Sequence, residues 1–384
     1  MTVARMARRL VQLAIPLSLA ALGTAAVAAV ATPATALASG AGGGPVVTQK
    51  TPLSPLNAVD GYLWWDDHTT SPASPKSYYA FDSVGGSMTV STPATGQYIA
   101  DFGGLSSIAG SAIAQVTTYG SADSCAVGSY ASDGHGGLKV YVDCFAGNTR
   151  ANAEFDLMVS HPTGTPSGTY DYAYVNKISS SGGLVVRQYN SARKDNSVKF
   201  LGTGKYQVTF GGPRTSGTAG IAKVSAFGNA PGDCELVKWF GSAAGEVVDV
   251  NCYSGSHAAQ NRAFLVTYAA TNNLMGQNSG VDANAFAHGT SPVYQPLVQY
   301  ANGRGARVTV VHYSTGSYEV LAAGSKGNIA EWGGDVQVNS VGASDGRCTV
   351  TNWTQQITPA IDIECVNKHG APADTPFTVE WVVP

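Results

Sequence analysis

Short stretches of the chain alternate strictly between two kinds of side chain. In residues 98–102, 206–210 and 377–381, apolar residues at every second position alternate with mostly polar ones. A period of two, interrupted by glycine-rich breaks, is typical of antiparallel strands with one buried face. No amphipathic helical pattern extends beyond about two turns. The pattern therefore predicts an all-β protein.

Several landmarks occur three times in the same order. Six cysteines fall into three pairs whose members are 19, 18 and 17 residues apart. A Thr-Gly-x-Tyr motif precedes each pair, and a phenylalanine follows each second cysteine by eleven or twelve residues. The tyrosines are Tyr98, Tyr206 and Tyr318, and the phenylalanines are Phe155, Phe264 and Phe377. The matched offsets predict three copies of one unit.

The repeat and the strand pattern together predict three tandem antiparallel β-sandwich domains of the immunoglobulin-like type. The expected division is a signal peptide at 1–38, a flexible linker at 39–57, and repeats at 58–162, 168–270 and 271–384. Each unit, at roughly 100 residues, is large enough for its own core. We therefore expect the units to fold independently.

The N-terminal residues carry the parts of a secretory signal. Three arginines within residues 1–9 precede an apolar run from Leu10 to about Ala31, and an Ala-Leu-Ala sequence ends at Ala38. A membrane anchor is the alternative, but Gln12, Pro16 and many small residues make the run a weak span. We expect a secreted, extracellular protein that is not an integral membrane protein after signal cleavage.

Each second cysteine ends a strand and shares its apolar face, as Cys144 does with Val140 and Val142. In the first two pairs, turn-like residues lie midway between the two cysteines, so each pair is expected to close a β-hairpin. A metal site or a redox dithiol is the alternative, but no Cys-x-x-Cys occurs and an exported protein favours disulfides. The expected bonds are Cys125–Cys144, Cys234–Cys252 and Cys348–Cys365.

An aromatic residue follows each first cysteine by five positions, at Tyr130, Trp239 and Trp353. The odd offset places these rings on the outward face of the strand. A ring exposed there in every unit would stack on a sugar or anchor a protein partner. Two alternatives remain: a β-bulge returns the ring to the core, or the ring packs on a neighbouring unit.

The chain contains no metalloprotease, nucleophile-elbow, EF-hand or phosphate-loop motif, and its histidines do not recur at one repeat position. Ser132, Asp133 and His135 are best interpreted as a polar hairpin tip. Asp66, Asp67 and His68 suggest a cation site, but the other units have no counterpart. We expect no enzyme activity, no cofactor and no metal.

Charge narrows the range of partners. The formal net charge is −3, the isoelectric point is about 6.1, and only 12% of residues are charged. A nucleic-acid-binding protein would carry a basic patch or stripe, so no nucleic acid is expected. The expected partner is an extracellular protein or a glycan.

Five segments of the second unit together resemble a known repeat. They are residues 203–210, 222–228, 234–239, 248–252 and 264–268. The series resembles a repeat of similar length in uncharacterised secreted proteins of actinobacteria and other soil bacteria. The likeness covers nearly all of the mature chain and is weakest in the third unit, where Ala322 replaces the phenylalanine that ends the strand. The resemblance implies a secreted repeat protein and carries no assigned activity or functional residues.

Three functions are compatible with these features. The first is a non-enzymatic surface, matrix or binding protein, in which tandem copies add avidity. The second is a carbohydrate-binding protein or secreted hydrolase. It needs the repeated aromatics exposed on one side, and a hydrolase also needs convergent carboxylates or a nucleophile–base pair. The third is an inhibitor or toxin-like factor that presents a rigid loop.

Overall fold

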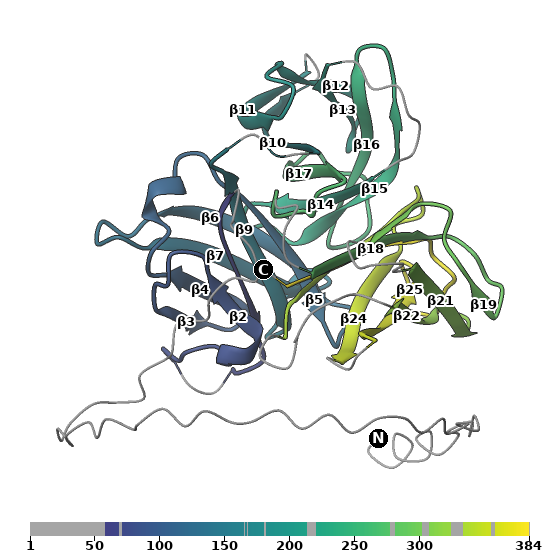
Figure 1. Ribbon diagram of the computed structural model, residues 1–384, viewed down its shortest axis with the longest axis horizontal. Coiled ribbons are helices and arrows are strands. Elements are labelled where there is room, and N and C mark those ends of the chain that lie inside the picture. The colour runs from purple at the N-terminus through teal and green to yellow at the C-terminus, as the bar shows by residue number, and fades with distance from the viewer. Residues whose placement is uncertain are drawn as a thin grey trace, which may run out of the picture. The chain divides into compact units, whose positions relative to one another are not determined.

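The computed structural model describes residues 58–68, 71–164, 166, 168–179, 182–212, 220–276, 281–301, 307–323, 333–354 and 358–383. The predicted signal peptide 1–38 and linker 39–57 lie outside these residues. The described residues belong to one compact unit. They form an all-β fold with two short 3-10 turns, Ser77–Tyr79 (η1) and Ser106–Ile108 (η2), which confirms the predicted class (Figure 1). In this part of the chain, no helix has the length and apolarity that a bilayer crossing requires.

The first segment, 58–162, contributes two groups of antiparallel strands. One group has the order β2-β1-β9-β5, and the other has the order β3-β4-β7-β6 with β8 on β7. The first group consists of β1 (Ala58–Trp65), β2 (Ala80–Asp82), β5 (Ile113–Tyr119) and β9 (Glu154–Pro162). The second group consists of β3 (Met88–Ala94), β4 (Gln97–Phe102), β6 (Ser124–Ser132), β7 (Leu138–Ala146) and β8 (Thr149–Arg150).

The second segment, 169–270, has the corresponding strand orders β11-β10-β17-β14 and β12-β13-β16-β15. The strands of the first order are β10 (Thr169–Ser179), β11 (Gly182–Asn190), β14 (Ile221–Phe227) and β17 (Ala263–Ala270). Those of the second order are β12 (Asn196–Gly202), β13 (Lys205–Gly211), β15 (Gly232–Gly241) and β16 (Gly245–Ser254).

The third segment, 281–383, follows with the orders β20-β18-β26-β23 and β19-β21-β22-β25-β24. The first order contains β18 (Val281–Ala287), β20 (Gln299–Ala301), β23 (Asp335–Ser340) and β26 (Phe377–Val383). The second contains β19 (Val293–Tyr294), β21 (Arg307–Ser314), β22 (Ser317–Ala323), β24 (Arg347–Thr354) and β25 (Ala360–Val366).

Within each segment, an aromatic pair joins the two groups of strands. The tyrosine of each Thr-Gly-x-Tyr motif lies edge-on or tilted against the phenylalanine of the last long strand. The ring centroids are 5.0 Å apart for Tyr98–Phe155, 5.2 Å for Tyr206–Phe264 and 5.2 Å for Tyr318–Phe377. All six side chains are buried. The two landmarks that recur in the sequence therefore hold the two layers of strands together.

The three disulfides join Cys125–Cys144, Cys234–Cys252 and Cys348–Cys365. Each lies across the antiparallel pair β6–β7, β15–β16 or β24–β25, with the two cysteines directly opposite in register. Figure 1 shows β15 and β16 as two long adjacent strands of this kind. Each bond closes a loop of about 20 residues, and the chain-entropy model assigns it on the order of 3 kcal/mol.

The segments are joined through shared sheets and a shared core, although the second and third segments each keep one four-stranded sheet of their own. Two nine-stranded sheets form because β14 pairs with β6 and β24 pairs with β5, in both cases in parallel. One cluster of buried apolar side chains includes Leu157, Leu265 and Val379, which come from the three different segments. A second cluster comes almost entirely from the second segment, with Ala126 and Val341 added from the other two. The apolar side chains of the first and third segments thus share one core, and the second segment has a core of its own beside it.

Candidate functional site where the three segments meet

Three backbone contacts of the same kind join the segments in a cycle. The residue that ends β5 or β14, or that follows β23, forms a parallel bridge to the second residue after the first cysteine of another segment. The bridges are Tyr119 with Val350, Phe227 with Val127, and Val341 with Leu236. The first segment thus contacts the third, the second contacts the first, and the third contacts the second. These contacts close on themselves.

A glycine strengthens each bridge. The N–H of Gly120 donates to the Val350 carbonyl at 2.8 Å, that of Gly228 to Val127 at 2.9 Å, and that of Gly342 to Leu236 at 2.7 Å. The φ angles of the three glycines are 70°, 106° and 150°. Glycine adopts such positive angles without steric cost, so the contact specifies glycine at each position.

Polar side chains form a second cycle, three residues before the bridges on the same strands. The buried N–H of Val116 donates to Ser225 Oγ at 3.0 Å, that of Val224 to Asn339 Oδ1 at 2.6 Å, and that of Val338 to Thr117 Oγ1 at 3.2 Å. Each bond crosses from one segment to another. A buried N–H without a partner lowers the stability of the fold. Each of these side chains accepts from an N–H group of another segment and so avoids that loss.

Ionisable groups lie buried beside this cycle. Lys223 is 3% exposed, and its Nζ donates to Thr117 Oγ1 and to the Val338 carbonyl, both at 2.7 Å. Burial lowers the pKa of Lys223 to about 7. Burial also raises the pKa of Asp335 to about 7 and raises the pKa of Asp156, which Asp335 raises further. The low-dielectric interior disfavours the charged form of all three groups.

A small polar cavity of about 70 Å³ opens at the meeting point. Its lining includes the first cysteine of each disulfide and the residue before it, namely Ser124, Cys125, Asp233, Cys234, Arg347 and Cys348. Arg347 Nε donates to Asp233 Oδ2 at 2.7 Å, so the second and third segments share an ion pair at this wall. Typical ligand pockets have volumes of roughly 300–1,000 Å³. This cavity has room for a few water-sized groups.

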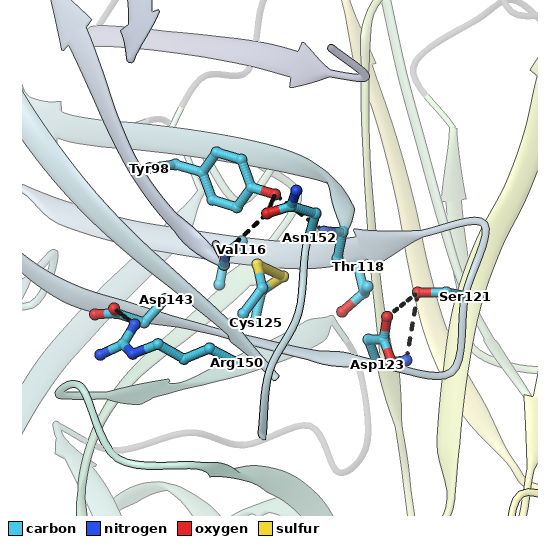
Figure 2. Close-up of a disulfide and its surroundings, with 12 residues drawn as sticks. Tyr98, Val116, Thr118, Ser121, Asp123, Cys125, Asp143, Arg150 and Asn152 are labelled. Carbon is cyan, nitrogen blue, oxygen red and sulfur yellow. Dashed lines mark hydrogen bonds and ion pairs between the residues drawn. A yellow bond between two sulfur atoms is a disulfide. The ribbon is translucent and has the colours of Figure 1, made fainter. Parts of the chain in front are cut away.

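Figure 2 shows the part of this wall that the first segment contributes. Cys125 lies between Val116 and the turn that contains Ser121 and Asp123. Ser121 Oγ donates to Asp123 Oδ2 at 3.1 Å, a hydrogen bond within the turn itself. The disulfide thus fixes the base of the loop that carries the contact to the third segment.

The predicted outward orientation of the repeated aromatics is wrong for Trp239 and Trp353, which are 4% and 6% exposed. A bulge lies in each hairpin strand, and the registers shift between Val127 and Ser129, Leu236 and Lys238, and Val350 and Asn352. The extra residue inverts the alternation.

Each of these rings packs on a neighbouring segment, which was one of the alternatives left open. Trp353 lies 5.4 Å from Tyr119, Trp239 lies 5.1 Å from Phe286, and the half-buried Tyr130 lies 6.2 Å from Phe227, measured between ring centroids. Trp239 and Trp353 therefore offer no exposed face for a sugar. Their contacts explain why the same position carries an aromatic in all three segments.

The other sequence candidates have local partners. Asp133 Oδ1 accepts from the N–H groups of His135 and Gly137 at 2.7 and 2.8 Å, as expected for a hairpin tip. Asp66 pairs with Lys76, and His68 Nδ1 lies 3.2 Å from Tyr98 Oη. Across the described ranges, no three His, Cys, Asp or Glu side chains group as metal ligands would.

Sequence reasoning missed Glu235 and Asp345. Both are buried, at 3% and 4% exposed, in the contact between the second and third segments. Burial raises the pKa of Glu235 to about 8 and that of Asp345 to about 6. The only sequence signal is that Glu235 alone is acidic among the residues that directly follow a first cysteine.

Comparisons of the chain with protein-family models, with curated proteins and with solved structures returned no match. The function is therefore argued from the geometry. The meeting point has a cycle of backbone contacts, buried ionisable groups and a cavity of a few water volumes. Chemically, this arrangement joins three chain segments and buries ionisable groups between them.

Proposed function

We propose that the protein is a secreted, non-enzymatic protein of the cell exterior, built from three immunoglobulin-like β-sandwich repeats. It acts as a surface, matrix or binding protein whose partner is an extracellular protein or a glycan. The corresponding strand orders of the three segments support the repeats. Three disulfides, which form and persist in oxidising compartments, support export.

One observation carries this proposal: the chemically distinctive positions that recur in all three segments hold the segments together. The aromatics Tyr130, Trp239 and Trp353 pack across segment boundaries. Gly120, Gly228 and Gly342 donate hydrogen bonds across the same boundaries. Recurring positions that join the segments are what a rigid scaffold requires. Three copies of an active site would instead have reactive side chains at the recurring positions.

The test uses the full chain and its mature form, residues 39–384. Expression of the full chain in an actinobacterial host should yield a secreted protein that begins near residue 39 and has no free thiol. The mature protein should bind saturably to isolated cell-wall material, to an extracellular polysaccharide or to intact cells, with no release of soluble product. The matched control is the same protein after reduction and alkylation, which should lose binding. Release of soluble sugars or peptides would favour the hydrolase, and retention inside the cell would contradict secretion.

A further inference from the structure

The contact between the second and third segments carries ionisable groups at a position where the other two contacts are uncharged. Glu235 directly follows the first cysteine of its hairpin, and the corresponding residues are Ala126 and Thr349. In each hairpin, this residue lies next to the disulfide and pairs with the residue that precedes the second cysteine. The backbone frame of the three contacts is shared, so the side chains make the difference.

Asp345, in the loop between β23 and β24, is held by the second segment on two sides. Its N–H donates to Glu235 Oε1 at 3.2 Å, and its Oδ2 lies 2.6 Å from His257 Nδ1. Glu235 Oε1 also accepts from Tyr253 Oη at 2.8 Å. Asp345 and His257 both adopt left-handed backbone conformations, with φ of 54° and 64°. Such residues persist where the surrounding contacts determine them.

The remaining oxygen of each carboxyl group is buried without a partner. Neither Glu235 Oε2 nor Asp345 Oδ1 has a hydrogen-bond partner among the described residues. An ionised carboxylate in such a place loses its hydration without compensation. A protonated carboxyl avoids most of that cost, so the contact favours the neutral acids.

The charged groups around the pair do not cancel this preference. Asp233, on the same strand as Glu235, adds negative charge and raises the pKa of both acids, in addition to the larger effect of burial. Arg347 is paired with Asp233 and lowers the pKa of Asp345 only partly, as does His257. The guanidinium of Arg262, also near Asp233, donates to backbone carbonyls instead.

We propose that the contact between the second and third segments is a proton-controlled latch. It is closed while Glu235 and Asp345 carry their protons, and it loosens when they ionise, so that the Gly342–Leu236 hydrogen bond opens before the two corresponding bonds. The latch holds in mildly acidic surroundings and weakens in alkaline ones.

The direction follows from linkage between protonation and folding. Unfolded Glu and Asp have pKa values of about 4.3 and 3.9, below the values of about 8 and about 6 in the closed contact. The stabilisation is complete below the unfolded values and is lost as the pH rises through the folded ones. Each proton released on opening raises the opening equilibrium constant by up to about tenfold per pH unit.

Hydrogen exchange on the intact mature protein tests the latch. Peptides that contain Gly342 are followed from about pH 5 to about pH 9, and their rates are corrected for intrinsic exchange. Peptides that contain Gly228, from the contact between the first and second segments, are the internal reference. The expected result is that protection at Gly342 falls with pH while protection at Gly228 does not. The fall should be steepest below about pH 6, where opening releases both protons, and gentler between about pH 6 and about pH 8, where it releases only that of Glu235.

Glu235→Gln keeps the acceptor and removes the ionisation, so it should abolish at least the upper part of the pH dependence. Asp345→Asn should make the part below about pH 6 less steep and leave the upper part, which keeps the test open if the first variant folds poorly. Glu364→Gln, at an exposed position of β25, is the matched control and should behave as the unmodified chain. Three outcomes would overturn the proposal. They are equal loss of protection at Gly342 and Gly228, an unchanged profile in both variants, or protection at neutral pH that a metal chelator removes, because a bound metal ion would then hold the contact.

Discussion

The first and second segments contact the third through the same backbone frame, but the buried acids Glu235 and Asp345 lie in only the second of these contacts. In the contact between the first and third segments, Trp353 is surrounded by the rings of Trp64 and Tyr119 at centroid distances of 5.6 and 5.4 Å. In the contact between the second and third segments, Trp239 packs on Phe286 at a centroid distance of 5.1 Å, and the two acids, Glu235 and Asp345, are buried as well. Both contacts therefore bury a tryptophan, and the contact between the second and third segments depends in addition on the protonation of two acids.

The difference shows which part of the contact defines the assembly. The glycine-to-carbonyl hydrogen bond is present in both contacts, at 2.8 Å for Gly120 and 2.7 Å for Gly342. The side chains around it are free to differ once that bond sets the strand positions. We infer that the backbone frame determines where the segments meet, and that the side chains determine how strongly and under what conditions they hold.

The largest effect is expected from Trp353→Ala, which removes the centre of the aromatic contact. Trp353 is 6% exposed, and its Nε1 donates to the Gly333 carbonyl at 2.8 Å. Truncation of a buried tryptophan costs about 3–5 kcal/mol, and the free energy of unfolding from denaturant titration should fall by that amount. The loss should be the same at acidic and alkaline pH. A loss that varies with pH would break the contrast between the two contacts.

The matched control for this variant is Tyr313→Ala, at an aromatic position of the same segment that is 61% exposed. Exposed substitutions of this kind change the free energy of unfolding by within about 0.5 kcal/mol. Equal losses in the two variants would mean that the aromatic contact contributes little to stability.

A smaller effect is expected from Gly342→Ala, because only the backbone opposes it. A Cβ at this position would meet nothing closer than Ser344 Oγ at 3.7 Å, but φ is 150°. Alanine in such a sparsely populated region costs about 1–3 kcal/mol. Gly120→Asn should cost less, because its φ of 70° lies in the left-handed region that asparagine tolerates. Thermal unfolding of the two variants ranks them, and the reverse order would contradict a shared backbone frame.

The smallest effect is expected from Ser225→Ala, which leaves the Val116 N–H without its acceptor. An unsatisfied buried donor costs about 1–2 kcal/mol. Ser197→Ala, at an exposed position of β12, is the control and should leave the free energy of unfolding unchanged within error. If the two substitutions cost the same, the cycle of side-chain hydrogen bonds does not stabilise the contacts.

Much of each segment could be predicted from the sequence because it is encoded locally. Val140, Val142 and Cys144 share one face of β7, and all three are buried as the alternation indicates. Opposed cysteines in a hairpin follow from the same alternation. The hydrophobic pattern of a strand and the turn residues near it are enough for such predictions.

The contacts between segments could not be predicted, for two physical reasons. A one-residue bulge inverts every later side chain of a strand, and nothing in the sequence around Val350 marks it. Lys223 has the charge of a solvent-facing residue, yet strands far away in the sequence bury it. The pattern of a single strand contains no information about a neighbour that covers its polar face.

The cyclic order of the contacts has a consequence for assembly. Each contact uses a different surface on its two participants, and head-to-tail interfaces of that kind either close or continue indefinitely as filaments. Here, three steps return to the starting surface. A single segment bearing both surfaces, cut free from its neighbours, is therefore expected to form trimers. Fusion into one polypeptide makes that stoichiometry independent of concentration.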